Sequence, residues 1–120
     1  MPILLAQPQL ECAVLLGSRT TGTAHEHSDW DIALQWSQQL EWFTVLSHTE
    51  TLRSQLADLM RIAPTATNLI ALRRANLAMR ASVVEEGVPL TGQDFLAWDQ
   101  FLQRTWRELE DIYLDKQHAA

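Results

Sequence analysis

Two aspartates separated by one residue, Asp29 and Asp31, are the side chains of this 120-residue sequence that most clearly suggest chemistry. On a β-strand, residues two apart project from the same face, so both carboxylates would point into one small volume. Such like charges repel each other, and a divalent cation removes that cost. Mg²⁺ prefers oxygen ligands and binds one or two carboxylates together with the phosphates of a substrate. The pair therefore predicts a site for magnesium and a nucleoside triphosphate.

A Gly-Ser pair, Gly17 and Ser18, precedes the aspartates by ten residues. Glycine lets the backbone approach a ligand closely, and Ser18 is a suitable N-cap for a helix that begins there. Backbone N–H groups at a helix N-terminus bind phosphate. Arg19 carries a permanent charge that also suits phosphate, although an exposed surface position is its commoner role. We expect Gly17, Ser18 and Arg19 to bind the triphosphate.

Neither motif is specific by itself. A lone Gly-Ser pair is usually a turn, and a lone Asp-x-Asp is usually a solvated strand edge or loop. Their conjunction on the two sides of one short loop is much more specific. His25 and His27 lie in that loop and could contact phosphate or a transition metal, but two histidines in a polar loop are more often plain surface residues.

Hydrophobic patterning indicates the elements that must position these residues. A continuous apolar run at residues 12–16 predicts a buried strand that ends at Gly17, and alternation over residues 29–36 predicts a second strand. Residues 38–61 have helical spacing, with a break near His48 and an end at Pro64. We further expect a strand at 68–72, a helix at 73–82, a strand or hairpin at 83–90, and a long amphipathic helix from Thr91 to about Lys116.

Composition and charge limit the class of protein. With 47% hydrophobic and 20% charged residues, the chain has the profile of one ordinary globular domain over residues 1–120. The single Cys12 lies in an apolar run, which predicts a buried thiol and no disulfide. No apolar run is long enough to cross a membrane, and no signal sequence is recognisable, so we expect a cytoplasmic protein. The net charge of −6 disfavours a general nucleic-acid surface, although Arg73, Arg74 and Arg80 could form a local basic patch.

The arrangement of strand, Gly-Ser, loop, Asp-Trp-Asp and strand resembles that of the MNT-type minimal nucleotidyltransferases, small relatives of DNA polymerase β. The similarity continues through residues 69–74 and 83–90 and covers roughly residues 15–90. It implies an α/β (α+β) fold of the polymerase-β-like type, with a small mixed sheet flanked by helices. The core would span about residues 10–90, and the long C-terminal helix about residues 92–117.

The resemblance also assigns roles to residues. It gives Gly17 and Ser18 to the triphosphate and Asp29 and Asp31 to the metal. The family usually has a third carboxylate on a later strand, in a run that resembles Asp-Leu-Val-Asp-Leu. Here Asn68 opens the corresponding run, Asn-Leu-Ile-Ala-Leu, so both acidic positions of that run are missing. An asparagine offers a neutral oxygen in place of a charge, which puts turnover in question more than nucleotide binding. A shifted alignment would leave another acid, such as Asp58, in that role, although its helical context favours a solvated position.

The function implied by the resemblance is that of an antitoxin. Such proteins transfer AMP from ATP, with Mg²⁺, to a tyrosine of a partner ribonuclease of the HEPN family and thereby neutralise that toxin. An acidic chain agrees with a basic RNA-cleaving partner. The alternative is a catalytically weakened or inactive antitoxin that neutralises its partner by binding alone. A small-molecule nucleotidyltransferase is a third interpretation, which the lack of a substrate domain disfavours.

Overall fold

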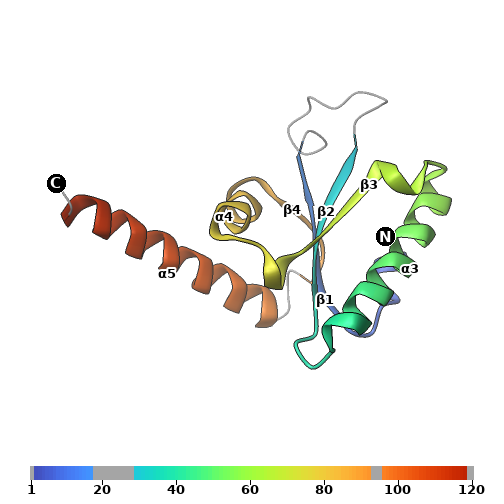
Figure 1. Ribbon diagram of the computed structural model, residues 1–120, viewed down its shortest axis with the longest axis horizontal. Coiled ribbons are helices and arrows are strands. Elements are labelled where there is room, and N and C mark those ends of the chain that lie inside the picture. The colour runs from blue at the N-terminus through green and yellow to red at the C-terminus, as the bar shows by residue number, and fades with distance from the viewer. Residues whose placement is uncertain (1, 18–28, 93–95, 119–120) are drawn as a thin grey trace.

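The computed structural model describes residues 2–17, 29–92 and 96–118 of the chain (Figure 1). Within them, a sheet has the strand order β3-β2-β1-β4. Its strands are β1 (Leu10–Leu16), β2 (Trp30–Trp36), β3 (Thr67–Ala71) and β4 (Val88–Thr91). Strand β1 is antiparallel to both β2 and β4, whereas β3 is parallel to β2. This mixed sheet with flanking helices confirms the predicted fold class.

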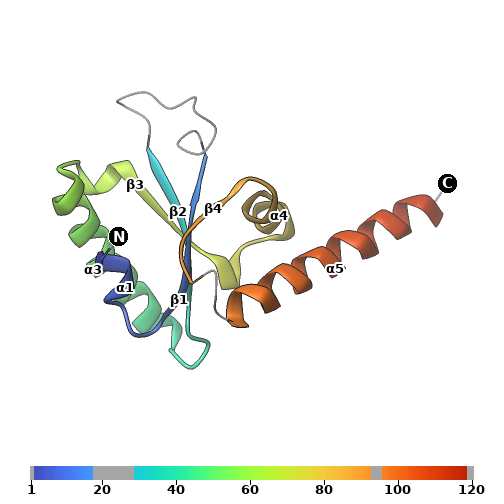
Figure 2. The ribbon, with the colours of Figure 1, turned by 180° about the vertical axis from the view of Figure 1, so that it is seen from behind.

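Helices cover both faces of the sheet (Figures 1 and 2). Helices α1 (Pro2–Leu5) and α3 (Trp42–Met60) lie on one face. Helices α4 (Leu77–Glu86) and α5 (Leu96–His118) lie on the other, and two short 3₁₀ turns, η1 (Pro64–Ala66) and η2 (Leu72–Arg74), flank β3. No helix within the described ranges is long and apolar enough to cross a membrane.

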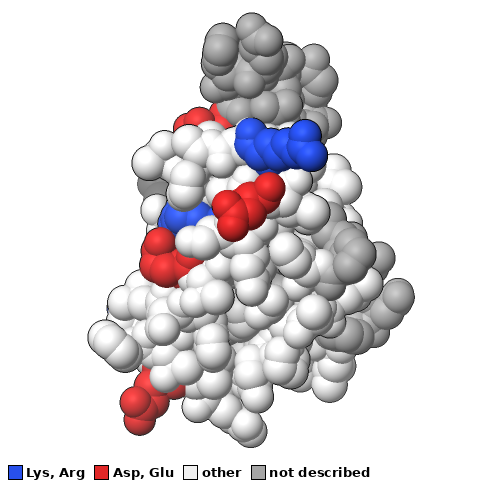
Figure 3. Space-filling view, turned by 90° about the vertical axis from the view of Figure 1, so that its right-hand side faces the viewer, with Lys and Arg blue, Asp and Glu red and all other residues white. Residues whose placement is uncertain are grey.

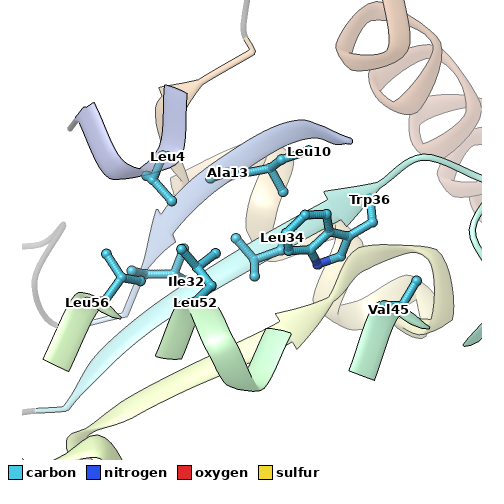
Figure 4. Close-up of a cluster of buried hydrophobic side chains, with 9 residues drawn as sticks. All are labelled: Leu4, Leu10, Ala13, Ile32, Leu34, Trp36, Val45, Leu52 and Leu56. Atoms are coloured by element: carbon cyan, nitrogen blue, oxygen red, sulfur yellow. The ribbon is translucent and has the colours of Figure 1, made fainter. Parts of the chain in front are cut away.

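The alternating pattern of β2 supplies both halves of the core. Ile32 and Leu34 are buried on the α3 face, where they pack in one cluster with Leu52 and Leu56 (Figure 4). Ala33 points to the opposite face and belongs to a second cluster. That cluster joins β1 and β2 to helices α4 and α5, and its members are Cys12, Val14, Leu16, Ala33, Leu72, Val83, Trp98 and Phe101. The period-two pattern read from the sequence thus reflects burial on both sides of the sheet.

Helix α3 differs from the expected helix at residues 38–61 in its start and in its buried side. It begins at Trp42 and continues without a break through His48, whose ring stacks on Trp36 at a centroid distance of 5.5 Å. Its buried residues include Val45 and Leu52, whereas Phe43 is 81% exposed. The expected break is therefore wrong, because the His48 ring packs against an aromatic partner without leaving the helix.

The segment from residue 73 to residue 90 also corrects the sequence prediction. Helix α4 begins at Leu77 because the side chain of Asn76 caps it, accepting a hydrogen bond from the Met79 N–H at 2.9 Å. The helix continues through Val83 to Glu86, so the run expected to be a strand from residue 83 is helical in its first part. Val83 is buried between α4 and the sheet, and this tertiary contact outweighs the β-propensity of the valine pair.

The last helix has the expected length but a later start. Thr91 ends strand β4 and does not begin a helix, and α5 is described from Leu96 onward. Trp98 is buried, whereas Trp106, two turns further along the helix, is 50% exposed. The apolar side of this amphipathic helix therefore packs on the body of the protein mainly along the first part of α5.

Candidate active site

Strand pairing brings the predicted site residues to one end of the sheet. In the antiparallel pairing of β1 with β2, Leu16 lies opposite Asp31, so Gly17 follows directly beside that aspartate. In the parallel pairing of β2 with β3, Asp31 lies opposite Asn68. Residues in register on adjacent strands project from the same face. The end of β1 and the starts of β2 and β3 therefore meet at one point.

The side chains of that point form a small hydrogen-bonded group. The Asn68 amide Nδ2 donates to Asp31 Oδ1 at 2.8 Å and lies 3.3 Å from Asp29 Oδ2, to which it also donates. Asp29 and Asn68 are exposed, and Asp31 is half-buried. Asn68 thus stands beside both carboxylates, in the position where a third acid was expected, and it supplies a neutral donor in place of a negative charge.

Position 17 requires a glycine for two reasons, its backbone conformation and the close approach of the Asp31 side chain. Its φ of 76° lies in the left-handed region, which side chains disfavour. A Cβ atom built at this position would lie 2.6 Å from Asp31 Oδ2, well inside van der Waals contact. The missing side chain therefore allows the backbone to turn directly against the Asp31 carboxylate.

The structure does not describe some of the predicted site residues, and it places another away from the site. Ser18 and Arg19, expected to bind phosphate, fall outside the described residues, as do His25 and His27. Asp58 is exposed on α3, and no group of three or more His, Cys, Asp or Glu suited to a metal occurs within the ranges described here. The shifted alignment with Asp58 as third acid therefore has no support.

The two neighbouring arginines lie at the opposite end of the strands from the aspartates. Arg73 donates to the Trp36 carbonyl oxygen at 2.8 Å and pairs with Glu11, near the end of β2 and the start of β1. The Arg74 guanidinium lies 3.7 Å from the centre of the Trp42 ring, a cation–π contact. Neither arginine faces the candidate site. A cationic side chain that contacts the triphosphate would therefore have to be another residue.

The donor set at the site fits one hard divalent cation. Asp29 and Asp31 present carboxylate oxygens, and turning the Asn68 amide by half a rotation would add its carbonyl oxygen. Mg²⁺ commonly takes one or two protein carboxylates and fills the remaining positions with water and phosphate. Two carboxylates and a neutral oxygen therefore suffice for one ion, while a second ion would depend on oxygens of the substrate.

A cavity of about 220 Å³ adjoins the carboxylates between β3 and α4. Its lining includes Gly17 and Asp31 together with residues that the sequence interpretation did not select: Leu16, Ile70, Met79, Ser82 and Glu86. The three residues from α4 are separated by three and four positions, which places them on one face of that helix. This spacing was visible in the sequence, but only the packing of α4 on the sheet reveals that the face borders Asp31.

Comparison with known proteins agrees with this geometry. The family model described as "Polymerase beta, Nucleotidyltransferase" matches residues 1–96. The chain belongs to this nucleotidyltransferase family. The matched part includes all strands of the sheet and the whole candidate site. The resemblance proposed from the sequence is thereby confirmed.

Solved structures with the same fold come from toxin–antitoxin complexes. A chain of a toxin–antitoxin complex with AMP-PNP is 25% identical, with a TM-score of 0.72, and the match covers 98% of this chain and 90% of that one. A chain of a mutant MntA toxin–antitoxin complex is 24% identical at a TM-score of 0.71, with 98% and 90% covered. A chain of the complex between the tri-AMPylated HEPN toxin of Shewanella oneidensis and the MNT antitoxin is 22% identical, with a TM-score of 0.61. The match covers 93% of this chain and 81% of that one. None of the curated proteins matches the sequence.

Proposed function

We propose that this protein is a cytoplasmic antitoxin that transfers AMP from ATP to a tyrosine hydroxyl of a partner HEPN-family ribonuclease. The observation that carries the proposal is the meeting of Asp29, Asp31 and Asn68 beside Gly17, in a chain of the nucleotidyltransferase family. Similar structures are toxin–antitoxin complexes, one of which contains AMP-PNP and another an AMPylated HEPN toxin. These relatives support both the nucleotide and the kind of acceptor.

The reaction is an in-line substitution at phosphorus. The tyrosine oxygen forms a bond to the α-phosphorus of ATP as the bond from that phosphorus to the bridging oxygen of the β-phosphate breaks, and pyrophosphate leaves. In the proposal, Asp29 and Asp31 hold Mg²⁺, which when bound neutralises charge that develops on the phosphates. Gly17, Ser18 and Arg19 hold the triphosphate. The protein thus contributes mainly position and charge neutralisation.

In this proposal Asn68 orients the two carboxylates through its hydrogen bonds and adds no negative charge to the metal site. Its amide donates to both aspartates and so limits their rotation. An aspartate at this position would add one negative charge to the metal site. We therefore expect slower transfer than in an otherwise identical chain with three carboxylates.

The acceptor is proposed to be a protein rather than nucleic acid. A net charge of −6 gives no general attraction for phosphate backbones, and it suits a basic partner. The candidate site lies at an exposed end of the sheet, where Asp29 and Asn68 are both accessible. A side chain presented by a folded partner could reach such a site.

The direct test is the intact mass of the partner after incubation with this protein, ATP and Mg²⁺. We expect a mass increase of one or more AMP groups with the unaltered protein and none after Asp29→Ala together with Asp31→Ala. Asp58→Ala serves as the matched control, because Asp58 is an exposed aspartate on α3 that does not touch the site. Persistence of the adduct in the double variant would refute the site assignment.

A binding-only antitoxin is the second candidate function, and Asn68 is the observation that favours it. Loss of the third charge weakens the metal site, and a protein that covers its partner needs no turnover. In that case the partner's ribonuclease activity would be suppressed with no mass increase. The Asp29→Ala, Asp31→Ala variant would then suppress it equally well.

A further inference from the structure

The cavity beside Asp31 continues along the face of α4 that points toward β3. The part nearest the carboxylates, about 220 Å³, is lined by Ile70, Met79, Ser82 and Glu86 in addition to Gly17 and Asp31. A neighbouring hollow of about 470 Å³ shares Ile70, Met79 and Ser82 and extends to Ala75, Asn76 and Ala78. A ligand entering from the α4 side therefore passes apolar side chains before it reaches a carboxylate.

The lining of this cavity disfavours the triphosphate. Asp31 and Glu86 both contribute carboxylates, and none of the residues that line it in the described part of the chain is a lysine or an arginine. A triphosphate carries several negative charges, and an unneutralised carboxylate such as Glu86 would repel it. In the proposed function the phosphates therefore lie on the side of Asp31 that faces away from Glu86.

A neutral aromatic ring with a hydroxyl suits the same lining. Ile70 and Met79 are half-buried and offer apolar contact, and a methionine sulfur packs favourably against the edge of an aromatic ring. A phenolic hydroxyl needs a hydrogen-bond acceptor. The lining of the cavity supplies two carboxylates that can accept it, those of Asp31 and Glu86.

We infer that this cavity binds the aromatic hydroxyl side chain that receives AMP, and that Glu86 takes its proton. The inference rests on the proposed function and assigns its acceptor site. As the phenolic O–H bond breaks, the proton passes to the Glu86 carboxylate, and the oxygen bonds to the α-phosphorus. The bond from that phosphorus to the bridging oxygen breaks, and its electron pair leaves with pyrophosphate.

Other groups near the site are less suited to accept this proton. The Asn68 amide is neutral and already donates to both aspartates. The Ser82 hydroxyl donates to the Ala78 carbonyl oxygen at 3.3 Å within α4. Asp29 and Asp31 are committed to the metal in the proposed function. Glu86 is the carboxylate of the cavity that remains.

Methyl NMR of the methionines tests the acceptor site without any turnover. Met79 lines the cavity, whereas Met60 lies at the end of α3 on the other face of the sheet and serves as the internal control. We expect N-acetyl-tyrosinamide to shift the Met79 methyl resonance through its ring current, both with and without AMP-PNP and Mg²⁺, and to leave Met60 unchanged. A Met79 shift caused by AMP-PNP and not by the tyrosine probe would assign the cavity to the nucleotide and overturn the inference. So would the absence of any Met79 shift.

Two matched glutamine variants test the proton acceptor. Glu86→Gln should lower the rate of AMP transfer to the partner by about 10²–10⁴-fold, the usual contribution of a general base. It should leave the affinity for AMP-PNP, measured by calorimetry, within about twofold, because Glu86 does not contact the phosphates in the proposed arrangement. Glu85→Gln is the control, since Glu85 precedes Glu86 on α4 and does not line the cavity.

The outcomes separate this inference from the function on which it rests. Transfer by Glu86→Gln at the unaltered rate would remove Glu86 from the proton step while leaving the proposed function intact. No transfer by the unaltered protein would contradict the proposed function. The methionine resonances would then still decide whether the cavity takes an aromatic hydroxyl.

Discussion

Asn68 lets two carboxylates lie side by side in the absence of a metal. Its amide donates to Asp31 Oδ1 at 2.8 Å and to Asp29 Oδ2 at 3.3 Å, so part of the repulsion between the aspartates is compensated by a neutral dipole. Hydrogen bonds to charged groups typically contribute about 1.5–3 kcal/mol each when shielded from water, and less at an exposed site such as this one. The residue that weakens the metal site therefore also stabilises it when it is empty.

Replacement of Asn68 by aspartate should lower the stability of the protein without metal and strengthen the binding of Mg²⁺. Asn68→Asp removes both donors and adds a third negative charge, so we expect the free energy of unfolding without metal to fall by about 1–3 kcal/mol. Mg²⁺ should restore more stability to this variant than to the unaltered protein, because a third carboxylate strengthens its binding. Thermal unfolding with EDTA and with Mg²⁺ measures both effects. An equal response of the two proteins to Mg²⁺ would show that residue 68 does not face the ion.

Gly17 should tolerate no side chain. Gly17→Ala forces a residue with a Cβ into a φ of 76° and brings that atom within 2.6 Å of Asp31 Oδ2. The left-handed conformation alone costs about 1–2 kcal/mol, and relief of the contact requires Asp31 to move. We expect a lower midpoint of urea unfolding together with weaker Mg²⁺ binding by calorimetry. Loss of stability with unchanged Mg²⁺ binding would mean that Asp31 does not hold the ion.

The thiol of Cys12 should be unreactive in the folded protein. Burial raises the pKa of Cys12 to about 12, and the neighbouring negative charge of Glu11 adds to this increase. Because the thiolate is the nucleophile, iodoacetamide at pH 8 should alkylate the native protein far more slowly than the protein in guanidinium. The raised pKa also means that the Cys12 contribution to stability is complete below pH about 9 and declines above it, as the unfolded thiol ionises first. Equal native and denatured alkylation rates would contradict the burial of this side chain.

Sequence reasoning located the site residues that act through local spacing and missed those that depend on packing. Asp29 and Asp31 follow from their separation by one residue on a strand, and Asn68 follows from the resemblance of its run to a family pattern. Glu86 and Met79 belong to a helix whose position over the sheet no local pattern encodes. Nothing in their own sequence says that they would meet Asp31, which lies about 50 residues earlier in the chain.

At the scale of elements, strands were predicted more reliably than helix ends. The alternation of β2 fixes its two faces, because each face is buried in a different cluster. The parallel register that sets Asp31 opposite Asn68 could not be predicted, since it depends on the 30-residue connection through α3 and η1 between the two strands. The start of α4 depends on the Asn76 cap, and its extension past Val83 depends on burial against β1 and β2. In both cases the local sequence permits more than one conformation, and tertiary contacts determine which one forms.

Helix α5 contains a buried hydroxyl group without a hydrogen-bond partner among the described residues. Thr105 is fully buried, and its hydroxyl has no hydrogen-bond partner among the residues described. Thr105→Val keeps the shape and removes the unsatisfied group, so it should raise the free energy of unfolding by about 1 kcal/mol in urea titration. Thr105→Ala is the control, because it also removes the hydroxyl but leaves a void and should not stabilise the protein. A destabilising valine would indicate that a water molecule satisfies the hydroxyl.

At the scale of the whole molecule, charged side chains are unevenly distributed over the face that α3 covers. Figure 3 views the side covered by α3, where most of the positively and negatively charged side chains lie in the upper half and most of the lower half is uncharged. The exposed apolar side chains near the start of α3 include Trp42, Phe43 and Leu46. Helix α5 carries a second exposed group, since Ile112, Tyr113 and Leu114 are each more than 40% exposed. Exposed apolar side chains thus occur on both α3 and α5, which lie on opposite faces of the sheet.

The second half of α5 buries little of its surface against the rest of the described chain. The helix projects from the body of the protein in Figures 1 and 2, and the molecule extends 52 Å along its longest axis. Glu108 pairs with Arg80 of α4, and every residue from 110 to 116 is exposed. Helical segments shorter than about 12–15 residues are marginal in water without tertiary packing. In the free protein, we therefore expect amide hydrogens from residue 110 onward to exchange nearly as fast as in an unfolded peptide.

Amides near Phe101 and Thr105, on the packed half of the same helix, provide the internal control and should exchange only on larger unfolding. Glu108→Gln should move the boundary between fast and slow exchange toward the N-terminus of α5, because it leaves Arg80 without its carboxylate and weakens the contact between α4 and α5. Glu110→Gln, on an exposed position two residues later, should leave the boundary in place. Slow exchange throughout α5 at every protein concentration would mean that its second half is stable in the single chain and would contradict this prediction. Slow exchange only at high concentration would mean that a second copy of the chain packs against its apolar side.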